Sequence, residues 1–160
     1  MSFLNNLKNK FISSNNSRKI SAVVASGIVG TAVMTVFSYK AYLFGIPKMK
    51  EINMLDILIS KKAPSHILLA TTIHFSVGIM FSTSYRALWS QGLGKPDPLN
   101  GLILGSICGV IGVAVWQAVI KTNAKLPQLT LAHLISTLMP AHILFGLSAV
   151  ETYNRLKNIP

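Results

Sequence analysis

The stretch His74-Phe-Ser-Val-Gly78, which runs on to Tyr85, returns later in the chain as His142-Ile-Leu-Phe-Gly146, which runs on to Tyr153. In both copies the glycine follows the histidine by four residues and the tyrosine follows it by eleven. These spacings are close to one and three turns of an α-helix, so the three residues share one face of each helix. We expect that face to look inward, toward neighbouring helices.

The rest of the composition indicates where those helices lie. The chain has 160 residues, of which 51% are apolar and only 12% are charged, so it is too apolar for an ordinary soluble domain. Four stretches each carry roughly the 20 mostly uncharged residues that a helix needs to cross a bilayer. They cover residues 20–44, 64–89, 98–120 and 126–153. The sequence therefore predicts four transmembrane helices.

The first and third spans also resemble each other. Gly27-Ile-Val-Gly30 in the first span matches Gly109-Val-Ile-Gly112 in the third. Together with the histidine motif of the second and fourth spans, this predicts an internal repeat of two helix hairpins. We therefore expect an all-α, integral membrane four-helix bundle in one domain, residues 20–160, with the two histidines facing each other across the axis that relates the halves.

Small residues predict how these helices pack. Glycines one helical turn apart let a neighbouring backbone approach closely, which is the commonest packing device in membrane helices. Such glycines form a pair in the first span and a continuous stripe in the third, and we assign them to helix packing: Gly27, Gly30, Gly101, Gly105, Gly109 and Gly112.

Three segments outside the spans have recognisable patterns. Residues 1–19 place apolar side chains on one face of a helix and are otherwise polar and basic, which predicts an amphipathic N-terminal arm. Residues 48–62 read as a short interfacial helix between the first two spans. Asp97 is followed by Pro98, which predicts a helix that is capped by the aspartate and has proline at its first position.

The net charge of +11 favours anionic lipid headgroups as partners over nucleic acid. The basic residues lie beside helix ends, and no basic and aromatic surface recurs as it would on a nucleic-acid platform. Four of them, Lys8, Lys10, Arg18 and Lys19, precede the first span and favour cytoplasmic termini. We expect a bacterial inner membrane protein.

His74 and His142 are the candidate site residues. Two imidazoles that face each other inside a bundle have the arrangement of the axial ligands of a b-type haem. Gly78 and Gly146, one turn beyond them, would leave room for a flat macrocycle, so these four residues form a predicted cofactor site. The alternative is that each imidazole hydrogen-bonds across a helix contact that its glycine makes possible. A third interpretation is a small transporter or channel that uses the polar residues Thr71, His74, Ser82 and His142 along the axis of the bundle.

Enzymatic activity is not expected. No nucleophile, base and orienting acid occur together, and the spans contain no pair of carboxylates. The single Cys108 excludes an internal disulfide and a thiolate metal cluster, and we predict no metal site. The first functional hypothesis is therefore a non-enzymatic accessory or assembly subunit that packs through its glycine-rich faces, either within a homo-oligomer or against another membrane protein.

Several of these patterns together resemble a known family. The run from Gly27 to Thr35, the motif from His74 to Tyr85 and the glycine-rich third span are similar to a family of uncharacterised small four-helix membrane proteins that carry a domain of unknown function. The resemblance covers about residues 22–153 and leaves out the basic arm. It implies the four-helix membrane fold and implies no activity.

Overall fold

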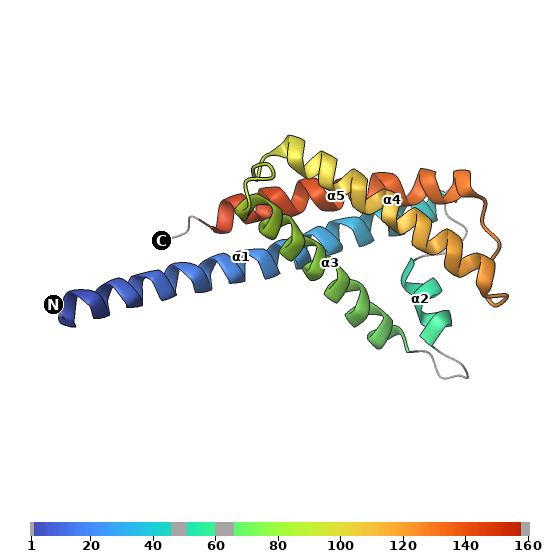
Figure 1. The fold of residues 1–160 in the computed structure, drawn as a ribbon. Coiled ribbons are helices and arrows are strands. Elements are labelled where there is room, and N and C mark those ends of the chain that lie inside the picture. The colour runs from blue at the N-terminus through green and yellow to red at the C-terminus, as the bar shows by residue number, and fades with distance from the viewer. Residues whose placement is uncertain (1, 46–50, 60–65, 158–160) are drawn as a thin grey trace.

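The computed structural model of the chain describes residues 2–45, 51–59 and 66–157. It contains the helices α1 (Ser2–Leu43), α2 (Glu51–Ile59), α3 (Ile67–Ser90), α4 (Pro98–Thr122) and α5 (Leu131–Leu156), in that order (Figure 1). Four helical segments are long and apolar enough to cross a membrane, namely Ser17–Leu43, α3, α4 and α5. The predicted all-α fold with four membrane helices is confirmed.

The N-terminal arm is not a separate helix. Helix α1 runs without interruption from Ser2 to Leu43, and only its part from Ser17 onward is apolar enough to span. In Figure 1 the first half of α1 extends well beyond the other helices. The helix ends shortly before Gly45, whose φ of 75° lies in the left-handed region that glycine adopts without steric cost.

Local capping explains where α4 and α5 begin. Asp97 caps α4 as predicted, because its Oδ1 accepts a hydrogen bond from the backbone N–H of Asn100 at 2.8 Å. That hydrogen bond holds the pKa of the Asp97 carboxyl below its usual value. Helix α5 begins at Leu131, later than the predicted residue 126, because Thr130 caps it by accepting from the N–H of His133 at 3.2 Å.

The helices pack in the spatial order α3, α1, α5, α4. Helix α5 lies between α1 and α4 and packs along both, while α3 packs on the other side of α1 and also touches α2. The two outer helices, α3 and α4, make no contact of similar extent. Figure 1 shows α3 diverging from α4 toward the end of the molecule where α2 lies. The bundle is therefore closed on its α1–α5 side and open between α3 and α4.

At one end, aromatic side chains close the gap between α3 and the rest of the bundle. The rings of Tyr85 and Phe145 are 6.1 Å apart, and those of Trp89 and Tyr153 are 5.3 Å apart. The hydroxyl of Tyr85 also lies 3.3 Å from Sγ of Cys108 on α4. Tyr85 is buried and Trp89 is partly buried. Both lie on the same helix face as Gly78, and that face meets α5.

At the opposite end, α2 packs against the turn between α4 and α5. Met54 is buried there with Ile120, Leu126 and Leu134. The backbone N–H of His66, which precedes α3, donates to Oδ1 of Asp56 on α2 at 2.7 Å. The predicted connecting helix is thus present, and it joins the start of α3 to the far end of the α4–α5 pair.

Candidate functional site

The α1–α3 crossing is built on glycine. A Cβ added to Gly27 would lie 2.5 Å from the Cα of Ile79, so α1 and α3 touch backbone to backbone at this point. Across the same crossing, a Cβ on Gly78 would overlap with the Oγ1 of Thr31. Any larger residue at either position would force the two helices apart.

The α4–α5 crossing has the same construction and is longer. A Cβ on Gly105 would lie 2.6 Å from the carbonyl oxygen of His142, and one on Gly146 would overlap with the carbonyl oxygen of Gly101. Gly109, one turn further, faces the Sδ of Met139 at 2.8 Å. The glycine stripe of the third span is therefore covered by α5 of the same chain.

The α1–α5 seam joins the two pairs. Phe145, which is only 1% exposed, fills the space above Gly30, where an added Cβ would lie 2.8 Å from its ring. On the same helix face Ala141 and Ala149 are also fully buried. The six residues that the sequence assigned to helix packing therefore all face other helices of this chain.

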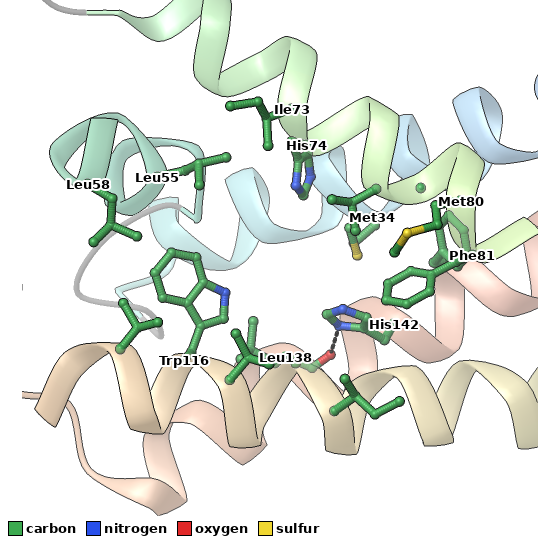
Figure 2. Close-up of a pocket in the computed structure, with 17 residues that line it drawn as sticks. Met34, Leu55, Leu58, Ile73, His74, Met80, Phe81, Trp116, Leu138 and His142 are labelled. Atoms are coloured by element: carbon green, nitrogen blue, oxygen red, sulfur yellow. Dashed lines mark hydrogen bonds between the residues drawn. The ribbon is translucent and has the colours of Figure 1, made fainter. Parts of the chain in front are cut away.

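The open side of the bundle is a groove of about 380 Å³ between α3 and α4, which falls within the roughly 300–1,000 Å³ typical of small-molecule sites. Helices α1 and α5 form its floor, and Leu55 and Leu58 of α2 line it too (Figure 2). Its walls are almost entirely aliphatic or aromatic. Large side chains that line it are Met34, Ile73, Met80, Phe81, Trp116 and Leu138. Among the residues that the structure describes, His74 and His142 are its titratable lining groups.

His142 lies on the α5 side of this α3–α4 groove. Its Nδ1 is 2.8 Å from the carbonyl oxygen of Leu138 (Figure 2). A carbonyl oxygen only accepts, so Nδ1 carries the hydrogen and the neutral ring has its lone pair on Nε2. That nitrogen lies over Gly112, where an added Cβ would be 3.2 Å away. Gly112 therefore makes room for the imidazole at the edge of the groove.

His74 lies on the opposite, α3 side, with its ring on the other side of the groove from that of His142 in Figure 2. Its Nε2 is 3.2 Å from Oγ1 of Thr35, and that hydroxyl donates to the carbonyl oxygen of Thr31 at 2.7 Å. A hydroxyl has one hydrogen, and the contact with the Thr31 carbonyl is the shorter of the two, so we assign Thr35 as the acceptor of Nε2–H of His74. The lone pair of the neutral ring is then on Nδ1.

The structure brings together some of the residues that the sequence predicted for a cofactor site. His74, His142 and Gly78 line the α3–α4 groove, whereas Gly146 faces α4 at the helix crossing instead. Both Gly78 and Gly146 are covered by neighbouring helices, so their absent side chains serve helix contacts.

The residues of the predicted polar path do not converge. Ser82 belongs to the α1–α3 contact, where its hydroxyl donates to the carbonyl oxygen of Val23 at 2.9 Å. The hydroxyl of Thr71 donates to the carbonyl oxygen of Ile67 in its own helix at 2.7 Å. Of the four residues, only His74 and His142 line the groove.

Sequence reasoning missed the other walls of the groove. No pattern in the sequence indicated Trp116, Met34 or the leucines of α2 as residues of a binding site. In the part of the chain that the structure describes, no three His, Cys, Asp or Glu side chains gather as a metal site. The α3–α4 groove is thus an apolar site with an imidazole on each side.

Comparison with known proteins gives a family and no function. A family model described as a family of unknown function, DUF6789, matches residues 17–160, and therefore all four candidate spans. No curated protein and no solved structure matches the chain.

Proposed function

We propose that this chain, which belongs to the family of unknown function DUF6789, is a non-enzymatic membrane protein that holds an apolar molecule of the bilayer in its α3–α4 groove. The observation that carries the proposal is the groove itself. It is large enough for a small molecule, it is lined by apolar side chains, and it lies between two helices that are long and apolar enough to face lipid. An apolar molecule could enter it sideways from the membrane.

The accessory role expected from the glycine-rich faces has less support than this binding role. Five of the six packing glycines are buried against helices of the same chain, and the sixth, Gly112, lines the groove beside His142. These glycines therefore offer little surface for a partner. A role as a subunit of a larger assembly, in a bacterial inner membrane with cytoplasmic termini, stays a prediction that the groove neither requires nor opposes.

A b-type haem is the second candidate, since two imidazole lone pairs line one groove. Haem would also bring two carboxylates, and among the residues that the structure describes no Lys or Arg lines the groove to pair with them. The described lining therefore supplies two ligands for the iron but no cationic partner for the carboxylates of haem. An absorption spectrum of the purified protein, before and after addition of haem, tests it: a Soret band that is lost in His142→Leu would favour haem over an apolar ligand.

The experiment for the first candidate is native mass spectrometry of the detergent-purified chain with a variant that fills the groove. Val115 lines the groove on α4 and is 53% exposed, so Val115→Phe should block the groove without disturbing the core. Val36 on α1 is 55% exposed and is not a groove residue, which makes Val36→Phe the matched control.

We expect a bound bilayer molecule in the parent chain and in Val36→Phe, and its loss in Val115→Phe. Equal retention by both variants, or a parent chain that carries no bound molecule in several mild detergents, would overturn the proposal.

A further inference from the structure

We infer that the α3–α4 groove selects apolar molecules that carry hydroxyl groups, because both imidazoles present lone pairs rather than N–H groups to a ligand. This inference rests on the proposed function and names the class of ligand: an apolar alcohol, phenol or hydroquinone. Two observations and one physical argument lead to it. The observations are the hydrogen bonds that set the tautomer of each ring and the apolar character of the remaining walls. The argument is that an imidazole inside a membrane helix is neutral.

The hydrogen bonds fix the tautomers. The Leu138 carbonyl holds the hydrogen of His142 on Nδ1, and the Thr35 hydroxyl, which donates to Thr31, holds that of His74 on Nε2. In the part of the chain that the structure describes, no hydrogen bond reaches the second nitrogen of either ring. Each second nitrogen is therefore an acceptor without a donor.

The rings are neutral for a general reason. Both lie in helices that are long and apolar enough to span a membrane, and a charged side chain is expensive at such a site. None of the described residues that line the groove is charged, and Lys121 at the end of α4 does not line it. Neutral imidazoles in these tautomers can accept from a ligand and cannot donate to it.

The ligand must then supply the hydrogens. A hydroxyl that donates to Nδ1 of His74 or Nε2 of His142 gains a hydrogen bond, whereas a carbonyl oxygen at the same place would set lone pair against lone pair. The rest of the molecule must be apolar, since Met80, Phe81 and Trp116 form the walls. A hydroquinone and the corresponding quinone have nearly the same shape, but the first has hydroxyl groups where the second has carbonyl groups. Comparing their affinities therefore shows whether the imidazoles accept hydrogen bonds from the ligand.

The test is competition by unlabelled probes against tritiated decylhydroquinone, bound to the full chain in detergent under anaerobic conditions. The probes are decylhydroquinone, decylbenzoquinone and decylbenzene. We expect the hydroquinone to bind more tightly than the quinone by about fivefold for each hydrogen bond that a hydroxyl makes with an imidazole. Decylbenzene, which has no polar group, should resemble the quinone.

His74→Leu and His142→Leu are the variants that test the assignment. Neither leaves a buried donor without an acceptor, because Thr35 still donates to Thr31 and the Leu138 carbonyl loses only an extra bond from the ring. Each should lower the preference for the hydroquinone about fivefold if its imidazole accepts one hydrogen bond. His133, which does not line the groove, gives the control His133→Leu.

The outcomes separate the inference from the function it rests on. Tight but equal binding of all three probes, or a hydroquinone preference that survives both leucine substitutions, would overturn the inference and leave an apolar binding protein. Failure of every probe to compete, together with insensitivity to Val115→Phe, would remove the binding function as well.

Discussion

The closed α1–α5 side of the bundle and its open α3–α4 side are made by different kinds of residue. On the closed side, Gly30 and the alanines of α5 let the helices approach, and Phe145, which also lines the groove, fills the space above Gly30. On the open side, the larger side chains of Met80 and Phe81 on α3 and of Trp116 on α4 line the groove between these helices. Small residues therefore mark the closed side of this bundle, and large ones line its open side.

The comparison bears on the predicted internal repeat. Two equal hairpins related by an axis would pack α3 on α4 as closely as α1 on α5. Both hairpins have glycines where their helices cross, at Gly27 with Gly78 and at Gly105 with Gly146. The register differs, because the residue that matches Gly27 in the motif is Gly109, and Gly109 meets Met139. The interfaces between the hairpins differ, however, and the difference is the α3–α4 groove. The groove lies where the packing departs from the predicted repeat.

The largest effect should come from opening the closed side. Phe145→Ala removes a ring that is 1% exposed and touches Gly30, Phe81 and Tyr85, so we expect a loss of about 4 kcal/mol in the free energy of unfolding. Unfolding in detergent and SDS, followed by circular dichroism, measures it. Phe44→Ala, at a position that is 83% exposed, is the control and should change little. Equal effects would mean that the seam does not hold the hairpins together.

Two glycines near one helix crossing should differ sharply. Gly146→Ala places a methyl group against the backbone of Gly101, which cannot move without separating α4 from α5, so we expect a loss of about 2 kcal/mol. Gly112→Ala places its methyl group 3.1 Å from a ring carbon of His142, which can shift into the groove. It should stay within about 0.5 kcal/mol of the parent chain.

The same unfolding titration decides the glycine comparison. A Gly112→Ala variant as unstable as Gly146→Ala would show that the groove wall is as rigid as the crossing. The proposed difference between the closed and open sides of the bundle would then not hold at Gly112.

A smaller effect should come from the bond that ties α3 to α4 where the groove closes. Tyr85→Phe removes the hydroxyl that lies 3.3 Å from Sγ of Cys108, and we expect a loss of about 1 kcal/mol. A double-mutant cycle with Cys108→Ala isolates the pair, and the second substitution should cost less once the hydroxyl is gone. Strict additivity would mean that packing alone closes this end.

The smallest effect on stability should come from substitutions of Asp97, the cap of α4, which belongs to neither the closed nor the open side of the bundle. The native pKa of Asp97 is lowered from 3.8 by the hydrogen bond from Asn100, so the charged cap stabilises the fold at neutral pH. That contribution is lost as the pH falls through the lowered native pKa. Asp97→Asn should keep the cap and remove this acid-dependent loss, whereas Asp97→Ala should lose the cap at every pH. Thermal unfolding between neutral and strongly acidic pH checks both.

Much of the fold could be predicted from local pattern. The apolar stretches located the four long helices, Asp97 and Pro98 gave the first residue of α4, and the spacing of His, Gly and Tyr gave the buried face of α3 and α5. Local pattern gave no information where distant contacts decide the outcome. Tyr85 and Trp89 have the composition of an interfacial belt, and only their ring contacts with Phe145 and Tyr153 show that they also pack against α5.

The sequence by itself determined that this protein is a membrane bundle, that its glycines mark close helix contacts and that His74 and His142 share its interior. Only the tertiary structure decided that α5 fills the gap beside α1 while α3 and α4 stay apart, and that Thr35 and the Leu138 carbonyl fix the hydrogens of the two rings. The physical reason is that helix formation and membrane insertion depend on residues close in sequence, whereas a groove depends on which side chains meet across helices.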